Sequence, residues 1–254
     1  MPTVTARIKQ IQQPRGGYIK PSQFETQEID DGKVLHEEEN VHASIIGMAV
    51  DYLTRYAMGT KLQEAYAISL RGAENTHRMH EAGKYLHNIK GLDDKSIIHA
   101  CKMVTFDVWY RNPAQARKAK TANEINPDTD TIQNICVMVE RSVAFWNKYG
   151  PIVKDGFDFK PTGYTKTVSA GDGEFLTADT LWDFKVSKKS KPTKEHTLQV
   201  LMYWIMGQHT KKAEFIGITK LGIFNPRFNT AYILHTKDIS EDIIHTVETD
   251  VICY

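Results

Sequence analysis

Acidic and basic side chains that could do chemistry gather in one stretch of the chain, residues 171–207. Two short runs within it, 174–177 and 180–186, are rich in aromatic and β-branched residues and are separated by only two residues. Such runs predict a β-hairpin, in which Phe175 faces Trp182 across the two strands. The residues around this hairpin therefore lie in a predictable order on its two faces.

One face of the predicted hairpin carries four ionisable side chains, because side chains alternate between the faces of a strand. They are Asp172, Glu174, Asp183 and Lys185. Three carboxylates on one patch repel each other unless a divalent cation lies among them, and oxygen ligands favour Mg²⁺ or Mn²⁺ over zinc. A neighbouring lysine can orient a water molecule or stabilise charge on a phosphate. The pattern predicts a metal site.

A helix is predicted to follow over residues 193–208, with His196, Gln199 and Tyr203 on one side. The strand triplet Asp183-Phe184-Lys185, an upstream acid and the helical Gln199-x-x-x-Tyr203 together resemble the PD-(D/E)XK nuclease superfamily. Within it they resemble the RecB-like exonuclease branch, over about residues 163–207. The resemblance implies metal-dependent hydrolysis of DNA phosphodiesters, with DNA as partner and Mg²⁺ or Mn²⁺ as cofactor.

The resemblance also implies a role for each matching residue. Asp183 would be a metal ligand, Lys185 the catalytic lysine, and Gln199 and Tyr203 the helix pair that supports the site and the DNA end. The upstream acid has two candidates, which we keep open. Asp172 is one, and Glu174 is the other, standing where the Gly-x-x-Asp pattern of the family places its ligand.

An earlier helix, predicted over residues 41–58, offers a further metal ligand. RecB-like nucleases carry a Gly-x-x-x-His motif on an early helix, and the histidine approaches the metal. In this chain Gly47 begins the corresponding stretch and Asp51 falls at the position of the histidine. The resemblance therefore names Asp51 as a metal ligand, with His42 as an alternative.

A bare (D/E)xK triplet carries little information, and the chain contains two others, at residues 31–33 and 158–160. The second of these repeats the letters DFK. It is followed by Pro161, which suits a turn and not a central strand, and no QxxxY follows it at the right distance. The sequence context therefore selects the triplet at 183–185.

The net charge of +1 gives no overall preference for nucleic acid. Local charge is more informative, because lysines crowd the loop after Lys185, where phosphates would approach. These candidate nucleic-acid-binding residues are Lys188, Lys189, Lys191 and Lys194.

The order of predicted elements favours an α+β fold, an α/β sandwich in one domain spanning residues 1–254. We expect an irregular segment at 1–40, a mostly helical elaboration at 41–150, and a nuclease core at 155–254. Strands are predicted at 164–168, 215–223 and 230–235, besides the hairpin. This order matches the αβββαβ core of restriction-endonuclease-like PD-(D/E)XK proteins.

Composition indicates an ordinary soluble protein, with 41% hydrophobic and 25% charged residues. The three cysteines are odd in number and widely spaced, which favours free thiols in a reducing compartment. The sequence shows no basic-then-apolar leader and no long apolar run. We therefore expect a cytoplasmic protein that does not enter a membrane.

Two alternatives to a nuclease remain. One is a nuclease-fold protein that has lost turnover and binds nucleic acid or a protein partner; the other is a helical interaction protein in which the hairpin is only structural. RecB-like members serve recombination, repair, phage replication or defence. Because this chain contains no GxxxxGK[ST] motif, a helicase motor would come from a partner protein.

Overall fold

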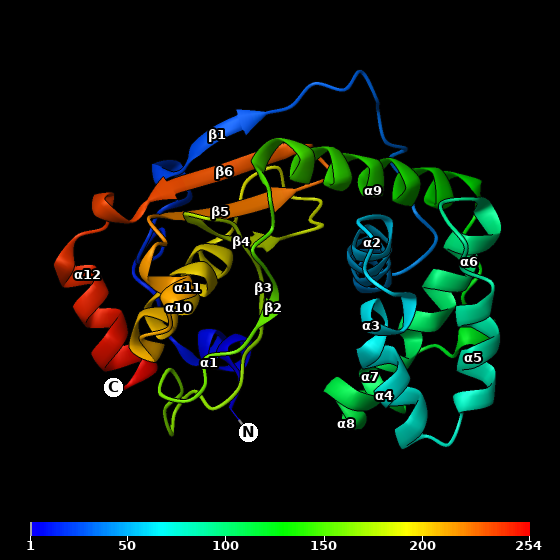
Figure 1. Ribbon diagram of the computed structural model, residues 1–254, viewed down its shortest axis with the longest axis horizontal. Coiled ribbons are helices and arrows are strands. Elements are labelled where there is room, and N and C mark those ends of the chain that lie inside the picture. Colours follow the sequence, from blue (N-terminus) through cyan, green and yellow to red (C-terminus); the bar gives the residue numbers. More distant parts are fainter. Residues whose placement is uncertain (1) are drawn as a thin grey trace. The chain divides into compact units, whose positions relative to one another are not determined.

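A mixed β-sheet forms the framework of the part of the chain that carries the predicted site (Figure 1). In this computed structural model, which describes residues 2–254, the sheet has six strands in the order β1-β6-β5-β4-β3-β2. Neighbouring strands are antiparallel except β4 and β5, which are parallel. The strands are β1 Glu25–Glu28, β2 Lys154–Phe157, β3 Gly173–Leu176, β4 Thr180–Phe184, β5 Lys220–Asn225 and β6 Thr230–His235. The fold is thus mixed α/β, compatible with the predicted α+β class.

The chain divides into two compact units, where we expected one domain. Unit 1 comprises the residues up to Asp30 together with Trp146–Tyr254, and unit 2 comprises Asp31–Phe145. The N-terminal residues join unit 1 because β1 pairs with β6, with Glu25 opposite Ile233. The helical part is therefore inserted between two pieces of the sheet-containing unit.

The N-terminal segment also corrects the expectation that residues 1–40 are irregular. Within it lie helix α1 (Val4–Gln10), a 3₁₀ turn (Pro21–Gln23) and strand β1. Thr3 caps α1 by accepting a hydrogen bond from Ala6 N–H at 3.1 Å. Strand β1 has no apolar alternation, because it is a mostly exposed edge strand that pairs through its backbone.

The predicted hairpin forms with the expected register. Phe175 lies opposite Trp182, and Leu176 lies opposite Leu181. The aromatic face packs against Trp146, near the C-terminal end of helix α9 (Thr129–Tyr149), whose ring stacks on Phe184 with centroids 5.1 Å apart. This packing places the aromatic side chains on one face of the sheet. The residues that alternate with them along the strands therefore lie on the other face.

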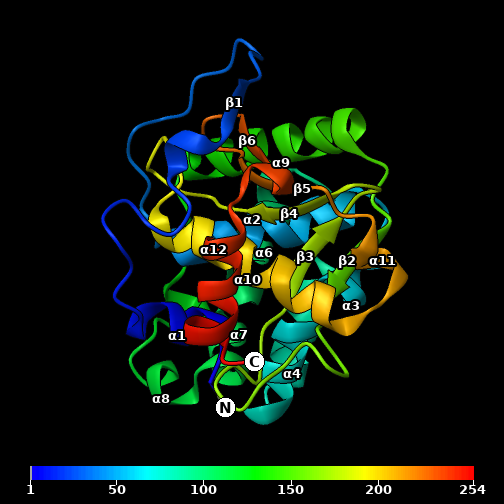
Figure 2. The same ribbon diagram turned by 90° about the vertical axis from the view of Figure 1, so that its left-hand side faces the viewer.

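The opposite face of the sheet is covered by helix α10 (Lys194–Thr210), capped by Thr193. The helix packs on β4 and β5 with one side, and contacts α1 and the C-terminal π-helical turn Val247–Ile252 with others. Figure 2 shows α10 and the neighbouring α12 (Glu241–Thr246) on this face. Apolar residues therefore surround α10, and any polar side chain that it directs toward the sheet lies in the interior.

Two strand predictions need correction. Residues 164–168 form no strand; they fold into a turn in which Thr165 Oγ1 accepts a hydrogen bond from Val168 N–H at 3.0 Å, and the strand beside β3 is β2 instead. The run 215–223 begins with the short helix α11 (Ala213–Ile216) before β5 starts. The return strand at 230–235 is confirmed as β6.

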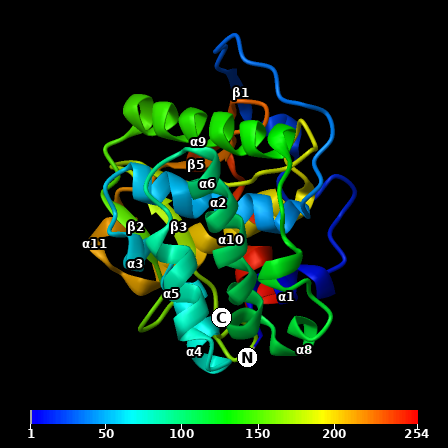
Figure 3. The same cartoon turned by 90° about the vertical axis from the view of Figure 1, so that its right-hand side faces the viewer.

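Unit 2 is helical, as predicted (Figures 1 and 3). Its helices are α2 Ala43–Ala57, α3 Leu62–Ala65, α4 Ala67–Asn75, α5 Met79–His87, α6 Asp94–Met103, α7 Asp107–Arg111, α8 Pro113–Ala116 and most of α9. Its interior contains one buried carboxylate, Asp107, which accepts hydrogen bonds from Tyr52 Oη and Ser69 Oγ, each at 2.5 Å. Burial nevertheless raises the pKa of Asp107.

Cys101, Cys136 and Cys253 are all free thiols. Among residues 2–254, no helix combines the length and the apolar character needed to cross a membrane.

A bidentate ion pair ties the start of unit 2 to α9. Arg141 donates from Nε to Asp31 Oδ2 at 2.7 Å and from Nη2 to Asp31 Oδ1 at 3.0 Å. The guanidinium is almost fully buried, with 6% of its side chain exposed. These hydrogen bonds lower the pKa of Asp31 below its ordinary value of 3.8.

Replacing Asp31 with Asn should therefore destabilise the protein in a pH-dependent way. Because the folded-state pKa lies below 3.8, the ion pair stabilises the fold fully above about pH 5 and ceases to do so as the pH falls through the folded pKa. We expect a loss of about 1–3 kcal/mol at neutral pH that shrinks on acidification, measured by urea unfolding from pH 3 to pH 7. A difference that stays constant across that range would contradict the assignment.

Candidate active site

The centre of the candidate site is the carboxylate of Asp183 on strand β4. The residue is 1% exposed, and neither of its side-chain oxygens accepts a hydrogen bond in the part of the chain that the structure describes. Lys185 Nζ lies 2.6 Å from Asp183 Oδ2 and forms an ion pair with it, although the angles between the groups are not those of a hydrogen bond. A buried carboxylate that accepts no hydrogen bond is costly.

Glu174 lies on strand β3, beyond the last regular pair of the hairpin. Its Oε2 accepts a hydrogen bond from Phe184 N–H at 2.5 Å. The Glu174 side chain thus continues the connection between β3 and β4 past the Phe175–Trp182 pair. Asp172 precedes β3 and is exposed to solvent.

Helix α10 contributes the two residues of the QxxxY pattern to the site. Gln199 Nε2 donates a hydrogen bond to Tyr203 Oη at 2.8 Å, and both side chains are buried. Burial, and after it the charge of Asp183, raises the pKa of Tyr203, and the charges of Glu174 and Asp172 act in the same direction. The three predicted carboxylates thus all lie near one phenol, so the structure gathers the hairpin and helix residues around Tyr203.

His196 joins this group, although its position in the sequence predicts only that it lies on the same side of the helix. Thr193 N–H donates to His196 Nδ1 at 3.4 Å as part of the cap of α10, so the ring hydrogen lies on Nε2. Burial lowers the pKa of His196, and the nearby charge of Lys185 lowers it further. The signal in the sequence was the spacing of residues 196, 199 and 203, which places them on one helix face.

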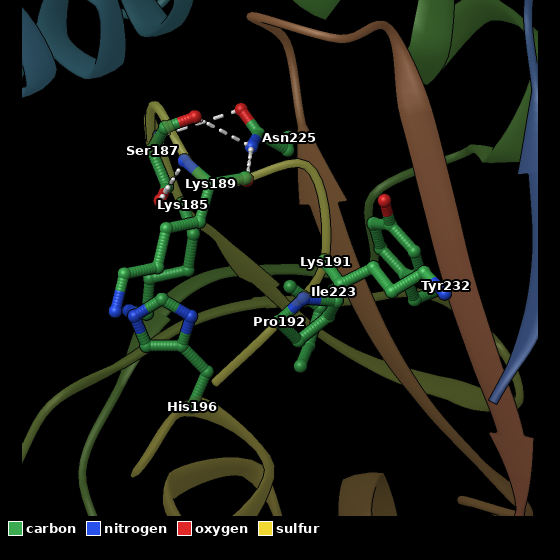
Figure 4. A pocket seen from close by; sticks show the side chains of 9 residues that line it. All are labelled: Lys185, Ser187, Lys189, Lys191, Pro192, His196, Ile223, Asn225 and Tyr232. Carbon is green, nitrogen blue, oxygen red and sulfur yellow. Dashed lines mark hydrogen bonds between the residues drawn. The ribbon is translucent and has the colours of Figure 1, made fainter. Parts of the chain in front are cut away.

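The four lysines predicted to bind nucleic acid differ in whether they line a pocket. Lys189 and Lys191 line a pocket together with Lys185 and His196 (Figure 4). Lys188, in the loop, and Lys194, the first residue of α10, do not line it, and all four lysines are exposed.

The residues predicted on the early helix belong to unit 2 and stay predictions. Asp51 lies on α2, where its Oδ1 accepts a hydrogen bond from Arg55 Nε at 2.9 Å. His42 caps the same helix, with Ser44 N–H donating to its Nδ1 at 3.2 Å.

Residues 2–254 contain no group of three or more His, Cys, Asp or Glu side chains arranged to hold a metal ion. Asp183 nevertheless fits a cation, because its two buried oxygens have lone pairs that no hydrogen bond uses. Asp172 is exposed and could supply a second oxygen donor. One carboxylate is an incomplete ligand set, so a hard cation such as Mg²⁺ or Mn²⁺ would need further oxygen donors beside Asp183.

The competing DFK triplet lies in the turn after β2, as its proline predicted. Asp158 Oδ1 accepts a hydrogen bond from Lys160 N–H at 3.1 Å, and the Asp158 carboxylate pairs with Lys212 at 3.6 Å.

Comparison of the chain with family models, with curated proteins and with solved structures finds no match.

Removing the Lys185 charge should destabilise the protein more than removing both charges of the pair. In Lys185→Met the Asp183 carboxylate stays buried without its ion pair, which should lower the free energy of unfolding by about 3 kcal/mol. The double variant Asp183→Asn/Lys185→Met should recover part of that loss, because no buried charge remains. Chemical denaturation in EDTA measures both.

The matched control for this cycle is Lys188→Met, an exposed lysine of the same loop. If Lys185→Met costs no more than this control, Asp183 does not depend on Lys185 for its countercharge.

Proposed function

We propose that unit 1 is a metal-dependent DNA nuclease of the PD-(D/E)XK type, which hydrolyses phosphodiester bonds with Mg²⁺ or Mn²⁺. The observation that carries this proposal is the Asp183 carboxylate, buried without a hydrogen bond beside Lys185 and above the Gln199–Tyr203 pair. Lys185 offsets the charge of Asp183, but neither carboxylate oxygen accepts a hydrogen bond, so the buried group lowers the stability of a hairpin that is only structural.

The connection of the elements supports the same proposal. Helix α9 is followed by β2, β3 and β4, then by α10 and, after the short α11, by β5. Three consecutive strands are antiparallel neighbours, and the helix then returns the chain so that β5 runs parallel to β4. This order is compatible with the αβββαβ core that the resemblance implies, and the DxK strand β4 lies in the interior of the sheet.

In the proposed hydrolysis each residue of the site has a separate role. Asp183 and one of Asp172 and Glu174 would hold the cation, which when bound supplies the positive charge that polarises the scissile phosphate and acidifies a water molecule. Lys185 Nζ positions the attacking water and stabilises the charge that develops on the phosphate. Gln199 and Tyr203 hold the site from the helix side. The resemblance to the RecB-like branch favours exonuclease action, with a helicase or a recombination or defence protein as partner.

The proposal predicts metal-dependent cleavage that requires Lys185. Linear and closed-circular DNA, single- and double-stranded, should be incubated with Mg²⁺, Mn²⁺ or EDTA. We expect wild type to degrade linear DNA only with metal, and Lys185→Ala to be slower by about 100-fold, the scale of losing one group that stabilises the transition state. The chain offers a matched control in Lys160→Ala, the lysine of the second DFK triplet, which should leave the rate unchanged. Equal rates for Lys185→Ala and wild type would contradict the proposal.

Metal binding can be tested without turnover. Mn²⁺ at concentrations well above its dissociation constant should raise the melting temperature of wild type, because a ligand that binds only the folded state stabilises it. Asp183→Asn should abolish this rise, since it removes the fixed ligand. Asp158→Asn, the acid of the second triplet, should retain it. A rise of equal size in Asp183→Asn would place the bound cation elsewhere.

A second candidate function is a nuclease-fold domain that binds DNA or a protein partner without cleaving. Two observations favour it. Glu174 already accepts a hydrogen bond from Phe184 N–H, and residues 2–254 contain no group of three or more side chains arranged to bind a metal ion. Stabilisation by Mn²⁺ that depends on Asp183, together with no cleavage of any DNA, would select this function.

A further inference from the structure

A small cationic pocket lies beside the candidate active site, within unit 1 (Figure 4). It is formed between the loop that follows β4 and the first turn of α10. Its floor is buried, since Ile223 is 1% exposed and Asn225 and Tyr232 are each 4% exposed.

Long-range contacts hold the loop that forms one wall of this pocket. Asn225, at the end of β5, donates from Nδ2 to the backbone oxygens of Ser187 at 2.9 Å and Lys189 at 3.2 Å. Tyr232, on β6, donates from its hydroxyl to Ser190 O. The backbone that carries the loop lysines is therefore held by hydrogen bonds at three of its residues.

Hydrogen-bond donors converge on one side of the pocket. Figure 4 shows the side chains of Lys185 and Lys189 running side by side toward the His196 ring, whereas Lys191 extends toward Tyr232. Lys185 is paired with Asp183, but Lys189 has no acidic side chain within ion-pair distance in the described chain. His196 Nε2 carries the ring hydrogen, because Nδ1 accepts from Thr193 N–H. Because Asp183 offsets the charge of Lys185, the ammonium of Lys189 and the imidazole donor of His196 are the groups that favour an anion here.

We infer that this pocket is a phosphate subsite, in which Lys189 and His196 hold a phosphate group of the DNA strand whose neighbouring phosphodiester lies at Lys185. The inference rests on the proposed function, since that function places DNA at Lys185. The ligand is a phosphate group, which belongs either to the end of a strand, as a monoester, or to the continuous backbone, as a diester. The buried floor suits the first source, and the open loop side suits the second.

The test compares two neighbouring lysines by DNA binding in EDTA, where no cleavage can occur. Lys189→Gln removes a pocket lysine, and Lys188→Gln is the matched control, because Lys188 is adjacent in the chain and does not line the pocket. Binding of three DNAs is followed by fluorescence anisotropy or gel shift: a duplex with 5′-phosphate ends, the same duplex with 5′-hydroxyl ends, and a closed circle. We expect Lys189→Gln to weaken binding by about tenfold, the loss of one charge-assisted hydrogen bond, and Lys188→Gln to weaken it by less than about threefold.

The pattern over the three DNAs identifies the source of the phosphate. A loss confined to the 5′-phosphorylated duplex assigns the pocket to a strand end, and an equal loss on all three assigns it to the backbone. His196→Gln provides a second variant that should keep the fold, because Gln at this helix position can still accept from Thr193 N–H. It should weaken binding of the same DNA that Lys189→Gln affects.

Equal effects of Lys189→Gln and Lys188→Gln would overturn the inference, since the loop would then act only as a diffuse positive surface. Inorganic phosphate gives a further check: it should compete with DNA for wild type and not for Lys189→Gln, and competition of equal strength for both would also overturn the inference. Binding in EDTA is independent of turnover. Loss of the subsite with Lys185-dependent cleavage intact would therefore leave the nuclease standing, and the reverse result would leave the subsite.

Discussion

The burial of one carboxylate, that of Asp183, constrains how the sheet and helix α10 of unit 1 are arranged. Asp183 lies on an interior strand between β3 and β5, so its backbone cannot move to expose the side chain without breaking two pairings of the sheet. The stacking of Trp146 on Phe184 fixes the opposite face. Because side chains alternate along the strand, an aromatic face on one side forces Asp183 onto the side of α10. On that helix the buried polar side chains Gln199 and Tyr203 lie among mostly apolar neighbours and bond to each other.

The same constraint explains what the sequence could predict. The hairpin register follows from local alternation and a two-residue connection, so the facing of Phe175 and Trp182 was readable without any knowledge of tertiary structure. The helix that carries Gln199 and Tyr203 can be predicted in the same way, because its N-cap and the spacing of these two residues lie within one continuous stretch of the chain. These are also the elements that carry the candidate site, which is why its central residues could be named in advance.

The features that the sequence did not predict depend on contacts between distant residues. Strand β1 is recognisable only by its pairing with β6, and the division into two units follows from that pairing. The residues 164–168 alternate like a strand but fold as a turn, while β2 occupies the edge beside β3. The loop lysines were visible as a group, but the contacts of Asn225 and Tyr232 decide which of them faces the pocket.

The two acids left open by the sequence are not energetically equivalent. Glu174 already accepts the Phe184 N–H, and withdrawing it to bind a cation with both oxygens would leave that donor unsatisfied, at a cost of about 1–3 kcal/mol. Asp172 is exposed, so turning it toward Asp183 sacrifices only its hydration. If a cation bound at Asp183, the less costly arrangement would keep the Glu174 hydrogen bond, which extends the hairpin to the site, and would use Asp172 as the second ligand. Glu174 would then act mainly as a support that holds β3 against β4 at the point where Asp183 and Lys185 leave the strand.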